Sequence, residues 1–336
     1  MNYKTTNLSG YICLVTGASK GIGKGIALSL GECGATVYIT GRTLISPDGL
    51  GLKDVALEIE KRGGHCIPVA CDHSDDSQVK SLFNRIKQEQ KGRLDLLVNN
   101  AFTAVNYILE QQENPGKGFW DLKSSETPEY VWDIHNKVGL RNSFICAVLA
   151  TQMMSEIRHK ALEPLPVGVL IQISSIGSVD YLFNPAYGAG KSGSDKMIKD
   201  MGFELRNAKE NIVAFSIWPG PVKTEKFNEA FKGKKSEGGI RDIFEKYGES
   251  PELTGRVIAH ILGQSSDKIK KLNSTVVSTG EYGYDNSIVD TNNQYPYSLR
   301  SLKMILNFLG MTTISKIIPR FLQVPKFLLK LKFSIY

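Results

Sequence analysis

Short apolar runs alternate with segments of helical periodicity along most of the chain. Continuous hydrophobic runs of this length are typical of parallel strands that are buried on both faces of a sheet. Strands are predicted at 11–16, 35–40, 65–71, 94–99, 167–173, 212–218 and 274–280. Helices are predicted between them, including 24–33, 52–62 and one that continues to about Asn207. The alternation predicts an α/β protein with a doubly wound parallel sheet in three α/β/α layers.

The first strand leads directly into a glycine-rich turn, and a helix follows at once. Glycines allow the backbone to turn tightly and to approach a pyrophosphate, which the free N–H groups of the helix N-terminus then bind. In this strand–turn–helix–strand context the turn indicates nucleotide binding rather than a purely structural role. The residues assigned to this cofactor site are Thr16, Gly17, Ser19, Lys20, Gly21, Ile22 and Gly23.

The end of the second strand indicates which nicotinamide cofactor is bound. NAD sites place an acid there for the ribose 2′-hydroxyl, whereas NADP sites replace it with basic groups for the 2′-phosphate. The stretch Thr40-Gly41-Arg42-Thr43 contains no acid, and Lys20 lies within the glycine turn. Arg42 and Lys20 therefore favour NADP(H) over the alternative of two solvated surface cations.

Tyr187 and Lys191 form the candidate chemical centre. Positions i and i+4 of a helix lie on one face, so both side chains can reach the same point. A nearby ammonium lowers the pKa of a tyrosine, which suits the phenol for supplying and recovering the proton of a carbonyl reduction. Taken alone, the pair also fits an aromatic ring packed on a lysine stem.

The Thr-Gly-x-x-x-Gly-x-Gly turn, the Asn99-Asn100-Ala101 segment and the Tyr187–Lys191 pair together resemble the short-chain dehydrogenase/reductase family, over roughly residues 8–280. The resemblance implies a Rossmann-type fold and hydride transfer between NADP(H) and a carbonyl. It implies that Tyr187 protonates the carbonyl oxygen, that Lys191 also holds the nicotinamide ribose, and that Ser175 polarises the carbonyl. Further cofactor contacts are implied for Asp72, Asn99, Pro219, Gly220, Val222 and Thr224.

Several positions depart from the family pattern or leave a choice open. The glycine that usually follows Asn-Asn-Ala is Phe102, and the family asparagine of the next helix is Gly139. Asn136 lies about one turn earlier and is rotated by about 60°, so it could substitute only if the helix is distorted. The catalytic serine is Ser174 by the usual spacing to the tyrosine, or Ser175 by strand register. We choose Ser175 because loop length varies more freely than strand register.

We also predict the locations of one residue and two segments near the expected site. His73 has no obvious partner in the sequence and is placed on the surface. The stretch 103–129 is longer and more polar than a compact connection needs, so it is expected to line the substrate mouth or to form a surface insertion. Residues 227–247, which are rich in glycine and lysine, are expected to form a lid over the substrate.

The net charge is concentrated in the C-terminal tail. The basic residues after Asp290 account for the whole formal charge of +7, and no acid follows that residue. The rest of the chain therefore gives no electrostatic case for nucleic-acid binding. Apolar residues with interspersed cations suit the surface of an anionic membrane, although packing on the protein or at an oligomer interface fits nearly as well. We therefore divide the chain into a dehydrogenase domain, 1–290, and a basic apolar extension, 291–336.

Cysteine usage and the N-terminus bear on the compartment. The five cysteines form no Cys-x-x-Cys and no metal-binding spacing, which predicts reduced, mostly buried thiols and no metal site. The polar N-terminus has no signal-peptide core, and no apolar run reaches the ~18 residues of a spanning helix. We expect a cytoplasmic, non-secreted homo-oligomer, either a dimer or a tetramer.

Two functions are compatible with these residues. The first is an NADPH-dependent reductase of ketones or aldehydes. Likeness to one branch of the family, carried by Val138-Gly139-Leu140-Arg141, Trp218-Pro219-Gly220 and Val324-Pro325-Lys326, implies steroid-like or xenobiotic carbonyls and a location peripheral to the endoplasmic reticulum membrane. The alternative, motivated by Gly139 and the basic tail, is an NADPH-binding, weakly catalytic scaffold or sensor at a membrane.

Overall fold

The computed structural model describes residues 6–47, 49, 51–113, 116–230, 240–308, 311–319 and 321–325. Within them, seven strands form one sheet in the order β3-β2-β1-β4-β5-β6-β7, and each neighbouring pair is parallel. The strands are β1 (Ile12–Val15), β2 (Thr36–Gly41), β3 (His65–Ala70), β4 (Leu96–Asn99), β5 (Gly168–Ile173), β6 (Ile212–Trp218) and β7 (Val276–Ser278). The strand order reverses between β1 and β4, which confirms the predicted doubly wound fold.

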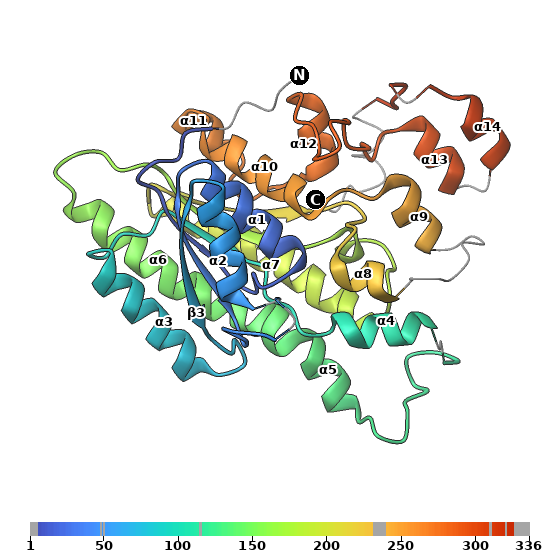
Figure 1. Cartoon of the computed structure of the whole chain (residues 1–336), viewed down its shortest axis with the longest axis horizontal. Helices are drawn as coiled ribbons and strands as arrows, with labels where there is room; N and C mark the ends of the chain where they lie inside the picture. The colour runs from blue at the N-terminus through green and yellow to red at the C-terminus, as the bar shows by residue number, and fades with distance from the viewer. Residues whose placement is uncertain are drawn as a thin grey trace.

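Helices connect the strands and cover the sheet on both sides (Figure 1). Those of the first half are α1 (Gly21–Glu32), α2 (Leu52–Lys61), α3 (Asp76–Glu89), α4 (Val105–Glu113), α5 (Pro128–Asn136), the π-helical η1 (Lys137–Asn142) and α6 (Ser143–Lys160). Those of the second half are the short η2 (Ile176–Ser178), α7 (Pro185–Asn207), α8 (Glu225–Ala230), α9 (Ile240–Tyr247), α10 (Pro251–Leu262), α11 (Ser266–Lys270), α12 (Thr279–Asp285), α13 (Leu302–Phe308) and α14 (Thr312–Ile317).

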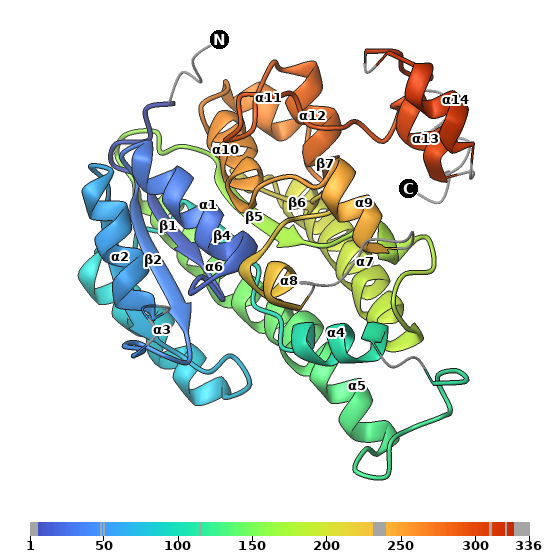
Figure 2. The same ribbon diagram turned by 45° about the vertical axis from the view of Figure 1, so that its right-hand side comes forward.

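Two hydrophobic cores lie on opposite faces of the sheet. In β1, Cys13 and Val15 belong to the core that α1, α2 and α10 cover, whereas Ile12 and Leu14 belong to the core of α3, α6 and α7. This alternation along a fully buried strand is the reason that the run is continuously apolar. Figure 2 shows the sheet between the two helical layers, so the three-layer architecture is confirmed. All five cysteines are buried and none forms a disulfide, as predicted.

The stretch 103–129 contains the helix α4, and its expected place at the substrate mouth stays a prediction. One local prediction is wrong. His73 is not on the surface, because only 4% of it is exposed. One ring nitrogen of His73 lies 2.7 Å from Thr40 Oγ1, and the other lies 2.8 Å from Asn142 Oδ1. These partners are distant in sequence and had no signal there.

The C-terminal segment forms the short helices α13 and α14, which lie at one side of the main body in Figures 1 and 2. Arg300 is almost buried, and its guanidinium pairs with Glu281 at 2.6 Å and with Asp285 at 3.2 Å. This cation therefore serves the packing of the segment on α12. No helix in the described part of the chain is long and apolar enough to cross a membrane. Residues 231–239 of the predicted lid and most of 320–336 lie outside the described residues.

Candidate active site

The carboxyl ends of β1, β4, β5 and β6 meet at one edge of the sheet, where α7 also begins. Asn184 is the N-cap of α7, and its side chain accepts a hydrogen bond of 2.9 Å from the backbone N–H of Tyr187. Pro185 occupies the first turn, where its lack of an N–H costs nothing. The cap fixes the start of the helix, so Tyr187 and Lys191 both point toward this edge of the sheet.

The phenol of Tyr187 lies against Ser175. Its hydroxyl donates to Ser175 Oγ at 2.9 Å, and the same Oγ accepts from the backbone N–H of Gly177, also at 2.9 Å. Ser174 faces away from the phenol, because its hydroxyl donates to the carbonyl of Lys191 at 3.4 Å. The structure therefore places Ser175 and Tyr187 side by side, where both hydroxyls can reach one carbonyl oxygen.

Burial controls the ionisation of the pair. The ammonium of Lys191 donates to the carbonyl of Ile173 at 3.0 Å and lies 5.8 Å from the centre of the Tyr187 ring. Burial raises the pKa of Tyr187 to about 12, and the bond to Ser175 opposes that rise. Burial also lowers the pKa of Lys191 to about 8, against the opposing effect of Asp195. The expected lowering of the Tyr187 pKa is thus wrong for this structure, because burial and the Asp195 carboxylate raise that pKa and the bond to Ser175 only partly offsets the rise.

The helix that should carry the family asparagine is distorted. The α-helical geometry of α5 ends at Asn136, and the π-helix η1 continues the chain to Asn142. A π-turn holds one residue more than an α-turn, so it changes which side chains face α7. Asn136 is buried there, and its amide nitrogen donates to the carbonyls of Trp132 and Ala186 at 3.2 Å each. The helix is therefore distorted, as was required for Asn136 to face α7, the helix of Tyr187 and Lys191.

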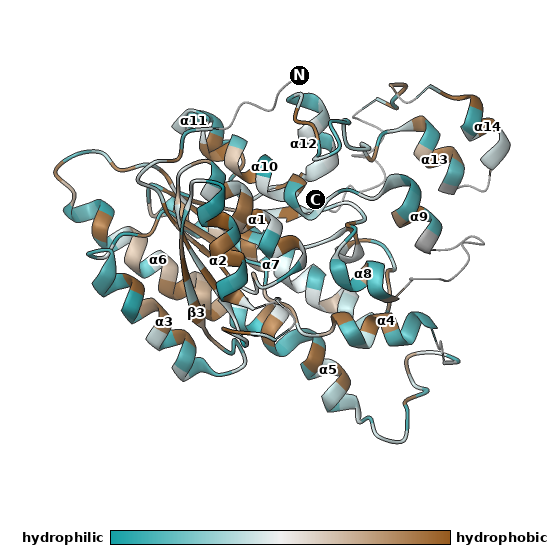
Figure 3. Cartoon of the chain, viewed as in Figure 1, coloured by the Kyte–Doolittle hydropathy of each residue, from teal (hydrophilic) through white to brown (hydrophobic). Residues whose placement is uncertain are grey.

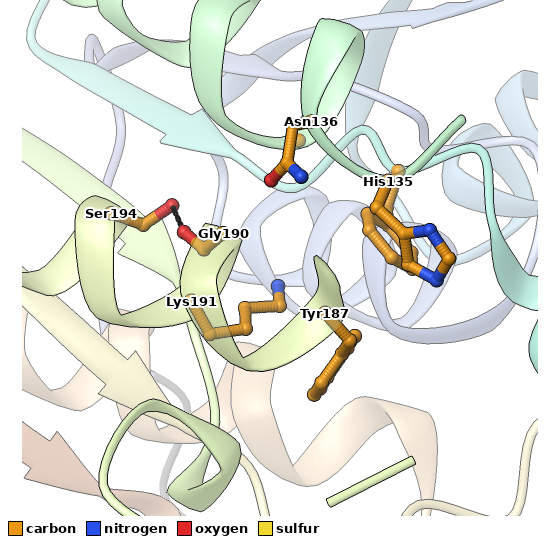
Figure 4. Close-up of a pocket in the computed structure, with 8 residues that line it drawn as sticks. His135, Asn136, Tyr187, Gly190, Lys191 and Ser194 are labelled. Atoms are coloured by element: carbon orange, nitrogen blue, oxygen red, sulfur yellow. Dashed lines mark hydrogen bonds between the residues drawn. The ribbon is translucent and has the colours of Figure 1, made fainter. Parts of the chain in front are cut away.

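A small cavity separates α5 and η1 from α7. Its volume of about 10 Å³ is close to the smallest that holds one water molecule. Figure 4 shows Asn136 and the ammonium of Lys191 pointing into the space between the two elements. The side-chain oxygen of Asn136 is buried and has no hydrogen-bond partner among the described residues. The cavity is lined by Phe102, His135, Asn136, Gly139, Tyr187, Gly190, Lys191 and Ser194.

The glycine-rich turn is held by the segment that follows β4. Thr16 Oγ1 accepts from the backbone N–H groups of Asn100 and Ala101, both at 3.0 Å. Gly17 has a φ of +65°, and a Cβ there would lie 2.7 Å from the Cα of Ala101. A Cβ on Gly23 would overlap the Asn100 amide. Gly17 therefore requires glycine for both conformation and space, and Gly23 requires it for space.

The N-terminus of α1 accepts a negative group. Lys20 is the N-cap residue and supplies no side-chain cap. The backbone N–H of Gly21 instead donates to Glu225 Oε2 of α8 at 2.8 Å. A carboxylate thus occupies the position at which a helix N-terminus binds phosphate oxygens, so the turn fits the pyrophosphate of a dinucleotide. Ser19 and Ile22 are partly exposed at the same turn, and Lys20 is exposed.

The adenosine end of the predicted cofactor site lies at β2 and β3. Arg42 is exposed directly after β2. The backbone N–H and hydroxyl of Ser74 hold the pKa of Asp72 below its usual value, and Arg42 lowers it further. Asp75, not Asp72, caps α3 by accepting from Ser77 and Gln78. Asp72 is bound instead to Ser74, whose N–H and hydroxyl both donate to its Oδ1 at 2.8 Å.

The predicted nicotinamide side contains an unexpected buried acid. Glu249 accepts from the backbone N–H of Gly220 at 3.0 Å and from Thr279 Oγ1 at 2.9 Å. Burial raises the pKa of Glu249 to about 8. Its backbone pairs with Val222, and Pro219 and Gly220 remain partly exposed beside it.

Two other predicted cofactor residues have separate surroundings. The methyl group of Thr224 lies 3.3 Å from the position of a Cβ on Gly21, so Thr224 faces the glycine turn. The amide of Asn99 donates to the carbonyl of Ser143 at 2.9 Å, which ties β4 to the start of α6. Among the described residues, no group of three His, Cys, Asp or Glu side chains has the arrangement of a metal site.

The family model for short chain dehydrogenase matches residues 11–235. The chain belongs to the short-chain dehydrogenase family. Human "Dehydrogenase/reductase SDR family member 1" is 37% identical over 329 residues, which cover 96% of this chain and 97% of that protein. "NADPH-dependent aldehyde reductase 2, chloroplastic" of Arabidopsis thaliana is 28% identical over 259 residues, which cover 73% of this chain and 85% of that protein. The crystal structure of a short-chain type dehydrogenase/reductase from Mycobacterium marinum shares the fold, with a TM-score of 0.62 and 24% identity. The match covers 81% of this chain and 94% of that one.

Proposed function

We propose that this short-chain dehydrogenase is an NADPH-dependent reductase of ketones or aldehydes, with Tyr187 as the general acid. The observation that carries the proposal is the contact of 2.9 Å between the hydroxyls of Tyr187 and Ser175, with the ammonium of Lys191 beside the phenol ring. Two hydroxyls at one point bind a carbonyl oxygen, and one of them donates its proton as negative charge develops there. Steroid-like and xenobiotic carbonyls are the substrate classes that we would test first.

Bound NADPH supplies the hydride for the substrate carbon. Ser175 orients the carbonyl and stabilises the charge on its oxygen, and Tyr187 delivers the proton to that oxygen. The raised pKa of Tyr187 keeps its phenol protonated at neutral pH, which is the form that reduction consumes. Lys191 then stabilises the phenolate that remains and, we propose, also holds the nicotinamide ribose.

Asn136 is our candidate for the group that holds a water molecule through which the proton is resupplied. Its unpartnered oxygen and the Lys191 ammonium border a cavity whose volume, about 10 Å³, is close to the smallest that holds one water molecule. We propose that a water molecule there accepts from Lys191 and donates to Asn136, so that Gly139 does not interrupt proton supply. Gly190 permits this arrangement, because a side chain at that position would overlap the Asn136 amide.

The proposed preference for NADPH rests on charge. Arg42 follows β2 at the position where NAD-binding proteins carry an acid, and Lys20 caps α1 without using its own side chain there. An aldehyde reductase that resembles this chain is named as NADPH-dependent. The other residues of the proposed cofactor site are Thr16, Gly17, Ser19, Gly21, Ile22, Gly23, Asp72, Asn99, Pro219, Gly220, Val222 and Thr224.

The test is NADPH oxidation against a panel of ketones and aldehydes, with wild type and Tyr187→Phe in parallel. We expect wild type to turn over at least one carbonyl and the variant to lose that turnover while it still binds NADPH. Equal rates in the two proteins would contradict the proposed role of Tyr187. Tight NADPH binding without turnover of any carbonyl would instead favour the scaffold or sensor function.

We further propose that the C-terminal extension contacts an anionic membrane peripherally, on the cytoplasmic side of the endoplasmic reticulum. In α14, Ile314 and Ile317 are exposed by 45% and 78%, and the exposed Lys316 lies between them. Arg300 does not contribute, since it pairs with Glu281 and Asp285. Flotation with anionic liposomes should decrease in an Ile314→Asp/Ile317→Asp variant; unchanged flotation would contradict the contact.

A homo-oligomer remains our expectation for the quaternary structure. Phe144 of α6 and Phe203 of α7 are 52% and 53% exposed, and both helices cover the same face of the sheet. Large exposed aromatic side chains are common at interfaces between subunits. Light scattering of wild type and of a Phe144→Asp/Phe203→Asp variant would test this, because only the variant should be monomeric.

A further inference from the structure

Phe102 and Gly139 are sterically coupled. A Cβ on Gly139 would lie 2.9 Å from Cδ2 of the Phe102 ring and 3.3 Å from Cε2. The first distance is too short for any side chain, so the aromatic ring occupies the space that a residue at 139 would need. The ring at 102 therefore conflicts sterically with a side chain at 139, so the two departures from the family pattern lie in direct contact.

The ring of Phe102 also contacts both members of the catalytic pair. The ammonium of Lys191 lies over it, 5.0 Å from its centroid. The ring of Tyr187 meets it edge-on, at a centroid distance of 5.9 Å and an interplanar angle of 77°. A cation within about 6 Å of a ring centroid is attracted by the negative face of the ring, most strongly where water is excluded.

Few other groups compensate the charge of Lys191. Among the described residues, none with a carboxylate forms an ion pair with it, and Asp195, on the same helix, acts only through space. From α5, His135 lines the cavity, and its own pKa is lowered by burial, so it is neutral at pH 7. From β5, the Ile173 carbonyl accepts one hydrogen bond. Tyr187, also on α7, is neutral until its proton is transferred.

We propose that Phe102 is a positioning residue that stabilises the charged form of Lys191 beside Tyr187 through a cation–π interaction, and that Gly139 is glycine because the ring needs its space. This proposal rests on the proposed function in one respect, namely that a charged Lys191 stabilises the phenolate of Tyr187. Burial lowers the pKa of this lysine to about 8, so without a compensating group a substantial fraction would be neutral near physiological pH. The ring opposes that loss.

The first experiment changes the electrostatics of the ring and leaves its shape nearly intact. Mono-, di- and trifluorophenylalanine at position 102 progressively weaken the negative face. The pKa of Lys191 is followed by NMR of lysine labelled with carbon-13 at Cε, with Lys191→Met to assign the signal. We expect the pKa to fall stepwise, by about 0.4 to 1.5 pH units in total. In the active enzyme, the loss of kcat/KM at alkaline pH should move to lower pH by a similar amount.

Phe183 provides the matched control. Its ring also meets Tyr187 edge-on, at 5.0 Å and 82°, but the Lys191 ammonium lies over the rings of Phe102 and Tyr187 instead. The same fluorinated residues at 183 should leave the pKa of Lys191 unchanged. Equal shifts at 102 and 183, or no shift at 102, would overturn the proposal. A stepwise NMR shift in a protein that reduces no carbonyl would support the proposal and contradict the proposed function instead.

The second experiment tests the steric coupling. Gly139→Ala should lower the melting temperature of the wild-type protein, because the new methyl group meets the Phe102 ring. In a Phe102→Ala background the same change should raise the melting temperature, since alanine favours a helix more than glycine does. A change of the same sign and size in both backgrounds would overturn the coupling of the two residues.

Discussion

Glu225 should compete with the cofactor for the N-terminus of α1. Its carboxylate accepts from the backbone N–H of Gly21 at 2.8 Å, where we place the pyrophosphate of NADPH. Charge at a helix N-terminus contributes about 0.3–1 kcal/mol at an exposed site, and Glu225 is exposed. NADPH must displace this interaction, so we expect Glu225→Gln to bind NADPH about two- to fivefold more tightly.

Isothermal titration calorimetry at low salt measures this effect directly. Glu229→Gln is the matched control, because Glu229 lies in the same helix and pairs with Lys226 instead of α1. The gain in affinity should shrink at high salt, as screening weakens the contribution of an exposed carboxylate. Unchanged or weaker NADPH binding in Glu225→Gln, relative to Glu229→Gln, would refute the competition and show that the carboxylate does not stand where the phosphates bind.

Three further predictions concern other parts of the site. Arg42→Ala should weaken NADPH binding about tenfold and leave NADH binding unchanged in fluorescence titrations, because only NADPH carries the 2′-phosphate. Gly190→Ala should lower stability by about 1–3 kcal/mol in urea unfolding through overlap with Asn136, whereas Gly188→Ala, with only an ordinary contact, should not. The folded-state pKa of Glu249 is raised from 4.5 to about 8, so the folded protein holds a proton that the unfolded chain releases. Stability should therefore fall between about pH 4.5 and 8, by at most about 1.4 kcal/mol per pH unit, and Glu249→Gln should remove that slope.

Local patterns in the sequence sufficed for the sheet and for most helices. The strand predicted at 212–218 is β6, with the same ends, because it is a continuous apolar run bounded by Asn211 and Pro219. The long helix predicted to continue to about Asn207 ends there. The glycine turn was predictable because the positive φ of Gly17 and the close contacts of Gly17 and Gly23 restrict both positions to one residue type.

The surroundings of the catalytic pair were less accessible from the sequence. A π-turn adds one residue without a compositional signal. The sequence could therefore predict that Asn136 faces α7 only on the condition that the helix is distorted. The contacts of Glu249 and Glu225 join positions that are tens to hundreds of residues apart, and no local pattern encodes them. The same holds for Phe102, whose partners Gly139 and Lys191 come from two later helices.

The pKa of Tyr187 could not be derived from its spacing to Lys191. Spacing on a helix brings a cation near the phenol, which by itself lowers the pKa. The burial of Tyr187, whose ring packs edge-on against Phe102 and Phe183, adds a desolvation effect of the opposite sign, and it prevails. Such a balance depends on tertiary burial, which a motif does not report.

The most direct test of the central proposal is single-turnover oxidation of enzyme-bound NADPH by a carbonyl substrate, followed by the loss of cofactor absorbance. General acid catalysis contributes about 100- to 10,000-fold, so Tyr187→Phe should slow this step by that factor while the Kd for NADPH stays unchanged. Oxidation of NADPH at the wild-type rate in Tyr187→Phe would contradict the role of Tyr187 as the proton donor.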